Sequence, residues 1–374
     1  MHILASPAFT NEKVNPYNAL LYRGIEAVNE TDNNKTDSSE TVKCESKKTV
    51  SEYSHKKAIL GKFDILHFHW PDGYINQRNL LKAVQRALLF SLIILIAKLK
   101  GAHIVWTVHN VTPHDAFHPK LSRFFMHWFI NRCNGLIFMS EESKATFLQI
   151  YKPPATIRYA IIPHGHYRSS YPAAIDKVSA KIKLGLPADK KVLLFCGMIK
   201  PYKNIDSLIQ TFAQTNLSHY ELVIAGKPDS PQLAEQLHQH KGDHANIHLF
   251  LQFIPDDQLH IYLSAADIVI LPYKSILNSG ALLLALSFNK PVIAPHIGAF
   301  VALQQELGKQ WIHSYDGDLQ VGTLSKALLQ LEALERTTIC PLENYDWNKL
   351  AALTVTFYQS LFQRSPTCKQ QVIS

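Results

Sequence analysis

The stretch that decides the fold is residues 265–295, AADIVILPYKSILNSGALLLALSFNKPVIAP. It opens with the apolar run Ile268–Leu271, which has the length and β-branched content of a buried strand. A helix-like apolar segment follows, and its first residues are the small or polar Asn278–Gly280. After a turn at 289–291, the run Val292–Ala294 again has the composition of a strand. This strand–helix–strand order predicts a parallel β-α-β unit.

The same alternation of short β-type runs and helical segments extends over most of the chain. Several runs are apolar without alternation, as strands buried on both faces are. A polar seam with two prolines, residues 168–190, separates two halves. The sequence therefore predicts an α/β fold with a parallel sheet in each half. The expected strands are His2–Ala5, Ile65–Trp70, Ile104–Val108, Leu136–Met139 and Ile161–Ile162, then Val192–Cys196, Leu222–Ala225, Ile247–Phe250, Ile268–Leu271 and Val292–Ala294.

Two segments lie outside this alternation. Residues 29–57 are rich in Asn, Asp, Ser, Thr, Glu and Lys and hold few apolar residues. This composition predicts a flexible insertion between the first helix and the second strand. A helix-like stretch, Trp347–Phe362, and a polar tail end the sequence.

Composition narrows the class of protein. The 374 residues suit two domains, and 47% hydrophobic residues suit a globular protein with a large core. The formal charge of +8 favours an anionic partner, which could be nucleic acid, an anionic membrane or a phosphorylated small molecule. Five cysteines without C-x-x-C spacing argue against a disulfide framework and a zinc site. Because no signal peptide is recognisable at the N-terminus, we expect a cytoplasmic protein.

The most lipophilic stretch is 87–97, ALLFSLIILIA. It is shorter than the ~20 apolar residues that span a bilayer. Basic residues flank it, namely Lys82, Arg86, Lys98 and Lys100. One interpretation is a buried helix. The other is a helix lying on an anionic membrane, which would place the protein at the inner face of the cell membrane.

The second half carries the pattern of a phosphate site. The strand Val192–Cys196 runs into Gly197 and a loop that contains Lys203, and the next strand ends at Gly226-Lys227. In parallel sheets, ligands bind at the carboxyl ends of strands. Ser279 and Gly280 would lie at a helix start, where unpaired N–H groups attract anions. The alternatives are a solvated lysine loop and a simple helix cap, and a cap is compatible with an anion site.

The order of these parts resembles a known family. In this sequence a strand is followed by GMIKPYKN, then by VIAGKP, AADIVILPY, a helix start of small residues and NKPVIAP. This order resembles that of GT-B glycosyltransferases of group 1. The resemblance implies two facing Rossmann-like domains that hold a nucleotide-sugar in a cleft. We expect an acceptor-side domain over 1–170, a donor domain over 171–345 and, over 346–374, a helix that crosses back to the first domain.

The sequence departs from that family at three places. Met198 stands where the family has an arginine, although Lys203 matches the family's lysine. Ile276 and Leu284 stand where the family carries two glutamates. The NSGALLLALS segment resembles instead a divergent group that includes exopolysaccharide β-mannosyltransferases of xanthan-type assembly.

The first half contributes histidines and carboxylates at predicted strand ends. The resemblance to GT-B enzymes implies that His109 stands at the place of a histidine that contacts the donor. Asp72 and Asp115 are the candidate general bases, and His109 is the third predicted catalytic residue. A lone histidine is more often structural, but the clustering favours a site. The remaining candidates for the acceptor or cleft are His69, Asn110, His114 and His164.

We therefore expect a metal-independent glycosyltransferase without a cofactor, with inversion favoured because both glutamates are absent. It would move a sugar from GDP-mannose or a UDP-sugar to a glycan or lipid-linked saccharide in surface polysaccharide synthesis. The alternatives are a nucleotide-sugar epimerase of GT-B architecture and a nucleic-acid-binding protein, which the dispersed basic residues disfavour. Asp316-Gly317-Asp318 is interpreted as a turn rather than a metal site. The expected donor contacts are Gly197, Lys203, Gly226, Lys227, Phe253, Ile254, Asn278, Ser279, Gly280 and Ala281.

Overall fold

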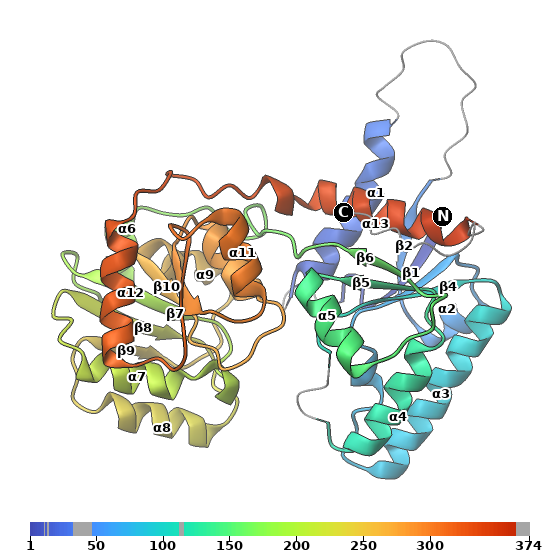
Figure 1. Ribbon diagram of the computed structural model, residues 1–374, viewed down its shortest axis with the longest axis horizontal. Helices are drawn as coiled ribbons and strands as arrows, with labels where there is room; N and C mark the ends of the chain where they lie inside the picture. Colours follow the sequence, from blue (N-terminus) through green and yellow to red (C-terminus); the bar gives the residue numbers. More distant parts are fainter. Residues whose placement is uncertain (11, 13–14, 33–46, 112–115, 364–374) are drawn as a thin grey trace, which may run out of the picture. The chain divides into compact units, whose positions relative to one another are not determined.

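The computed structural model describes residues 1–10, 12, 15–32, 47–111 and 116–363. The chain folds as two compact units (Figure 1). Unit 1 comprises Met1–Gly165 and Asn344–Ser374, and unit 2 comprises His166–Glu343. Each unit is built on a six-stranded sheet. The predicted boundaries fell at 170/171 and 345/346, a few residues beyond these.

Unit 1 has an all-parallel sheet in the order β2-β1-β3-β4-β5-β6. On one face lie α2, α3 and α4, and on the other α1 packs against α13 (Figure 1). The strands are β1 His2–Ser6, β2 Thr49–Glu52, β3 Ile65–Phe68, β4 His103–Thr107, β5 Gly135–Phe138 and β6 Arg158–Ile161. The helices are α1 Tyr17–Asp32, α2 His55–Leu60, the 3₁₀ helix η1 Pro71–Tyr74, α3 Leu80–Leu99, α4 Pro119–Ile130, α5 Glu141–Ile150 and α13 Trp347–Phe362.

The pairing of α1 with α13 is tight. A Cβ added to Gly24 would lie 2.9 Å from the Cβ of Ala351, so a glycine is needed where the two helices cross. Tyr22 and Tyr358 are both fully buried in the core of unit 1. A helix from the far end of the sequence therefore completes the core that the first 165 residues begin.

Unit 2 has a second all-parallel sheet, in the order β12-β11-β10-β7-β8-β9. Its central strands are buried on both faces, as their unbroken apolar sequences require. The strands are β7 Lys191–Cys196, β8 Tyr220–Ala225, β9 Ile247–Phe250, β10 Ile268–Ile270, β11 Val292–Pro295 and β12 Ile312–Tyr315. The helices are α6 Lys177–Lys183, η2 Pro201–Lys203, α7 Ile205–Gln214, α8 Pro231–Lys241, α9 Asp256–Ala265, α10 Gly280–Ser287, α11 Ala299–Leu307 and α12 Val321–Ala333, with η3 Glu343–Tyr345 at the junction with unit 1.

The two parallel sheets confirm the predicted α/β class, but two strands were missed. Both β2 and β12 lie at the edge of their sheet and contain polar residues. The prediction of a flexible insertion over 29–57 is wrong for 29–32, which belong to α1, and for 49–57, which contain β2 and the start of α2. Strand β2 pairs with β1 through its backbone, and its Glu52 carboxylate accepts the N–H groups of Ala8 and Phe9. An edge strand with polar residues is hard to predict from sequence, because its pairing is made by backbone groups and does not require apolar side chains.

Helix α3 also differs from expectation. The lipophilic stretch 87–97 extends into a helix of 20 residues, which is long and apolar enough to cross a membrane by length and composition. Only 28% of its most hydrophobic window is buried. The interpretation as a buried core helix therefore holds for one face of α3 only.

Candidate active-site elements in the two units

In unit 2, two glycine turns meet at the carboxyl ends of β7 and β8. Gly197 and Gly226 have φ angles of 132° and 151°, which L-residues with a Cβ rarely adopt. A Cβ at Gly226 would lie 1.9 Å from the carbonyl oxygen of Gly197. Both glycines are therefore required for the close approach of these turns, which lie at the edge where parallel sheets bind ligands.

Lys203 lies above the first of these turns. A Cβ added to Gly197 would be 3.6 Å from Lys203 Nζ. The ammonium also lies 5.7 Å from the ring centroid of Phe195 and 5.4 Å from that of Tyr273. Within the described ranges, no carboxylate pairs with it. Burial, aided by Lys200, lowers the pKa of Lys203 to about 8, so a cation without a counter-ion lies over a glycine turn.

The loop before α10 joins the same edge. Lys274 N–H donates to the carbonyl oxygen of Tyr202 at 2.8 Å, which ties this loop to η2. Ser279 is the N-cap of α10, and its Oγ accepts the N–H of Leu282 at 3.2 Å. The N–H groups of Gly280 and Ala281 lie in the first turn, where no i−4 carbonyl exists to accept them. The start of α10 therefore has both a side-chain cap, from Ser279, and two backbone N–H donors, from Gly280 and Ala281, that no carbonyl oxygen of the helix accepts.

The other predicted donor residues differ in exposure. Asn278 precedes the cap and is partly exposed, and Lys227 is exposed beside Gly226. After β9, the Phe253 side chain is exposed, whereas Ile254 is buried and contributes to the core instead. Ile276, at the place of the family's first glutamate, supports the turn after β11, since a Cβ at Gly298 would lie 2.2 Å from its carbonyl oxygen.

In unit 1, a buried chain of hydrogen bonds starts at His67, which is fully buried in β3. Its Nε2 lies 2.8 Å from Thr107 Oγ1 on β4. Its Nδ1 lies 2.8 Å from the hydroxyl of Tyr22 on α1 and 2.6 Å from that of Tyr358 on α13. Elements from both ends of the sequence therefore fix the His67 ring.

The chain continues to two predicted site residues. The Tyr22 hydroxyl lies 2.7 Å from His69 Nε2, and His69 Nδ1 lies 2.9 Å from His109 Nε2. The His109 ring stacks on Trp70, with centroids 4.4 Å apart. We call His67, Tyr22, His69 and His109 the histidine–tyrosine chain. His69 lies one residue after β3 and His109 two residues after β4, which places the chain at the carboxyl edge of the sheet.

Tyr17 contacts two histidines of the histidine–tyrosine chain and a third predicted site histidine. Its ring contacts His69, His109 and His164, with centroids 5.8, 5.0 and 4.8 Å away. On its other side, the ring of Trp347 from α13 lies 5.2 Å away. The structure therefore brings three of the predicted histidines around one buried aromatic ring.

Burial keeps these imidazoles neutral. It lowers the pKa of His67 to about 3 and that of His164 to about 4. Burial and neighbouring imidazoles hold the pKa values of His69 and His109 well below the ordinary range. A neutral imidazole has one donor and one acceptor nitrogen, so fixing one tautomer fixes the next along the chain. His109 Nδ1 is consequently a donor in one orientation of the chain and an acceptor in the other.

The remaining predicted residues of unit 1 do not join this chain. Asp72, in η1, lines a small cavity with Asn76, His118 and Ser122, on the side of α4. Asn110 is exposed next to His109. His114 and Asp115 lie outside the described residues, so their predicted roles stay predictions.

Sequence reasoning missed the tyrosines. Tyr17, Tyr22 and Tyr358 lie on helices distant in sequence from the histidines they contact. The one available signal is that polar-tipped aromatic residues occupy the apolar faces of Tyr17–Asp32 and Trp347–Phe362, since a buried hydroxyl usually needs a partner.

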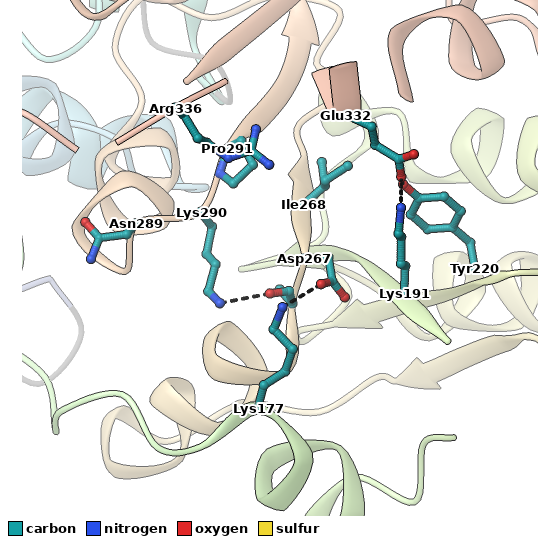
Figure 2. A pocket seen from close by; sticks show the side chains of 11 residues that line it. Lys177, Lys191, Tyr220, Asp267, Ile268, Asn289, Lys290, Pro291, Glu332 and Arg336 are labelled. Carbon is teal, nitrogen blue, oxygen red and sulfur yellow. Dashed lines mark hydrogen bonds and ion pairs between the residues drawn. The ribbon is translucent and has the colours of Figure 1, made fainter. Parts of the chain in front are cut away.

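A cavity of about 230 Å³ lies at the opposite, amino-terminal edge of the unit 2 sheet (Figure 2). Its carboxylates are occupied, since Lys177 pairs with Asp267 at 2.6 Å and Lys191 with Glu332 at 2.6 Å. Lys290 Nζ donates to the carbonyl oxygen of Ala266 at 2.9 Å. Because its charged groups are bound by one another or by backbone carbonyl oxygens, this cavity is better explained as structural than as the donor site.

Comparison with solved structures defines the fold. The chain matches Anabaena HepE in complex with UDP-glucose at a TM-score of 0.61 and 16% identity, covering 96% of this chain and 98% of that one. It matches a sucrose-phosphate synthase from Thermosynechococcus elongatus at a TM-score of 0.57 and 15% identity, covering 97% and 95%. Two Rossmann-like units with six-stranded parallel sheets and these neighbours define a GT-B protein.

Sequence comparison adds the family. Residues 176–335, nearly all of unit 2, match the family described as "Glycosyl transferases group 1". The chain is also 28% identical to a GDP-mannose:glycolipid 4-beta-D-mannosyltransferase from Xanthomonas campestris pv. campestris over 306 residues, which is 82% of each chain. Unit 2 thus contains a group 1 glycosyltransferase domain, and this domain favours glycosyl transfer over the epimerase and nucleic-acid-binding alternatives.

Proposed function

We propose that the protein transfers mannose from GDP-mannose to a lipid-linked saccharide during surface polysaccharide synthesis. The observation that carries the donor half of this proposal is Lys203, a half-buried ammonium over the Gly197 turn that no carboxylate of the described residues pairs with. The choice of GDP-mannose and of a lipid-linked acceptor is supported by the activity that the Xanthomonas relative's name states. A UDP-sugar is the second candidate donor, since UDP-glucose is bound by the HepE neighbour.

In unit 2, the diphosphate would be held by Lys203 and by the N–H groups of Gly280 and Ala281. A fixed cation and a helix N-terminus both stabilise the charge that develops on a departing nucleoside diphosphate. Because these groups supply positive charge themselves, we propose a reaction that does not depend on a metal ion.

In unit 1, we assign His109 to bind a sugar hydroxyl. The histidine–tyrosine chain holds its ring, and its low pKa keeps it neutral, which suits a hydrogen-bonding group rather than an ion. The acceptor hydroxyl would lose its proton to a carboxylate, for which Asp72 and Asp115 remain the candidates. Since Ile276 and Leu284 replace the family's two glutamates, we propose that the reaction inverts the anomeric centre.

The test is a transfer assay with a lipid-linked saccharide acceptor and either GDP-mannose or UDP-glucose. Nucleotide release and the anomeric configuration of the product, read by NMR, are measured. We expect His109→Ala to lower kcat by about 100-fold, which is typical for a positioned catalytic group, while the Kd for GDP changes little. The matched control is His219→Ala, an exposed histidine at the amino-terminal end of the unit 2 sheet.

Four outcomes would contradict the proposal. Transfer from UDP-glucose but not from GDP-mannose would reject the donor, and a retained anomeric configuration would reject inversion. Conversion of the nucleotide-sugar without any acceptor would identify an epimerase. Full activity of His109→Ala would remove that residue from the site.

A further inference from the structure

Helix α3 has two apolar faces, and one of them is exposed among the residues of unit 1 that the structure describes. The buried face holds Ala83, Ala87, Phe90, Ile93, Ile94 and Ala97, which pack into unit 1. Five leucines lie on the opposite face, because at 3.6 residues per turn they fall on a single narrow stripe. This leucine stripe consists of Leu81, Leu88, Leu92, Leu95 and Leu99, and all five are exposed.

The exposure of the leucine stripe is large. Leu88 is 67% and Leu99 88% exposed, and the stripe extends along a helix that is about 30 Å long at 1.5 Å per residue. Single exposed leucines are ordinary on protein surfaces, but a continuous apolar row of this length marks an interaction surface.

The segment that forms this surface carries a net positive charge. Residues 73–140 contain eight lysines and arginines and one acidic residue, Asp115, which is a net charge of +7 out of the chain's +8. The basic residues are as dispersed as composition suggests, and the positive charge of this segment arises because acidic residues are nearly absent from it. Within the part of the chain that the structure describes, no carboxylate pairs with the five basic residues of α3 and α4.

The neighbouring helices continue this surface. Helices α2 and α4 contact α3 in the same layer over the sheet (Figure 1). On the side of α4 that faces away from the sheet, Phe124 is 72% exposed and Arg123 lies beside it. Leu60 of α2 is exposed as well, near the end of α3. Apolar and cationic side chains thus occur together across three helices.

We propose that unit 1 docks through this surface on an anionic lipid bilayer, with α3 lying in the plane of the interface. Leucines would enter the acyl boundary while lysines and arginines remain at the headgroups, as in interfacial amphipathic helices. Each basic residue near an anionic surface adds to the attraction. A spanning orientation conflicts with the structure, because Phe90 and Ile94 would have to leave the core of unit 1.

A lipid surface fits these observations better than nucleic acid. Phosphate backbones bind lysine and arginine but give no reason to expose five leucines in a row. A second protein copy would bury the leucines but would bring two surfaces of like charge together. The proposal is independent of the glycosyl transfer, and its test requires neither donor nor acceptor.

The experiment is flotation of the full chain with phosphatidylglycerol/phosphatidylcholine vesicles and with phosphatidylcholine vesicles alone. We expect binding to the anionic vesicles that weakens with salt, and little binding to the neutral ones. Leu88→Gln with Leu92→Gln should reduce the partition coefficient by at least about tenfold, since burial of one leucine contributes roughly that factor. Lys82→Glu with Arg86→Glu should abolish the preference for anionic lipid.

The matched controls are Leu329→Gln, an equally exposed leucine of unit 2, and Lys183→Glu. Neither control should change the partition, and circular dichroism should show that all variants are folded. Absence of binding at low salt, or unchanged binding of the leucine variant, would overturn the proposal. Two further results would also overturn the proposal. One is a dimer in solution that the leucine substitutions dissociate, with no binding to vesicles. The other is vesicle binding that duplex DNA competes away and that the leucine substitutions leave unchanged.

Discussion

Replacing Lys203 by methionine should make the free protein more stable and nucleotide binding weaker. Methionine retains much of the apolar stem of lysine but removes the charge that lies near the rings of Phe195 and Tyr273. The opposed changes are expected because the ammonium is held in a half-buried place without a carboxylate, where only a bound anion compensates it.

Both magnitudes follow from the pKa and the contacts. A fall of the Lys203 pKa from 10.5 to about 8 corresponds to a cost of about 3 kcal/mol at pH 7, which is the upper limit of the gain in stability. A hydrogen bond between charged groups contributes about 1.5–3 kcal/mol, so the Kd for GDP should rise by between about tenfold and about 150-fold.

The pH dependence has a defined sign. The unfolded lysine keeps its proton to about pH 10.5 and the folded one to about pH 8. The unfolded state therefore binds more protons between these values, and the stability of the natural protein rises with pH over this range. The difference in free energy of unfolding between Lys203→Met and the natural protein should therefore become smaller as the pH rises over this range. GDP binding to the natural protein should weaken above about pH 8, as the ammonium loses its proton.

The assay combines titration calorimetry with GDP and urea unfolding at pH 7 and pH 9.5. The control is Lys290→Met, because the pKa of Lys290 is also lowered to about 8, but its Nζ donates to carbonyl oxygens at the opposite edge of the sheet (Figure 2). GDP affinity should survive in Lys290→Met. If Lys203→Met binds GDP within about threefold of the natural protein, the phosphate site is wrongly placed.

Two further predictions concern stability. Since the folded pKa of His67 is about 3 against 6.5 unfolded, the unfolded state takes up the extra proton between these values, and stability should fall by about 1.4 kcal/mol per pH unit below pH 6.5. Urea midpoints at pH 7 and pH 5 should show a smaller drop in His67→Gln, and an equal drop would contradict this reasoning. Gly226→Ala places a Cβ 1.9 Å from the Gly197 carbonyl oxygen and should destabilise by more than about 2 kcal/mol and weaken GDP binding. Gly322→Ala, with open space around it, should stabilise by up to about 1 kcal/mol, and similar results for both glycines would refute the argument.

The sequence predicted the parts of the fold that apolar burial determines. Buried strands such as Tyr220–Ala225 and Val292–Pro295 consist of unbroken apolar runs, and these were found. The edge strands Thr49–Glu52 and Ile312–Tyr315 were not, because one side of an edge strand has no neighbour and its residues need not be apolar.

The candidate site was predictable only where its features depend on residues that are close in sequence. The glycine turns at Gly197 and Gly226 and the helix cap at Ser279 were predictable, because a strand end followed by glycine and a helix cap are local patterns. The connection of His67 to Tyr22 and Tyr358 was not, since these residues lie 45 and 291 positions apart in sequence. No local pattern records a hydrogen bond between elements that meet only in the folded core.

The membership of α13 in unit 1 has a consequence for biosynthesis. Translation delivers the whole of unit 2 before α13, so unit 2 can fold while unit 1 still lacks the helix that covers α1. Until then, the groove at Gly24 and the hydroxyl of Tyr22 face water or other chains. A ribosome-bound intermediate should therefore contain a finished second unit behind an unfinished first one, the reverse of the usual N-to-C order. During this interval unit 1 is the part of the chain that needs protection by chaperones.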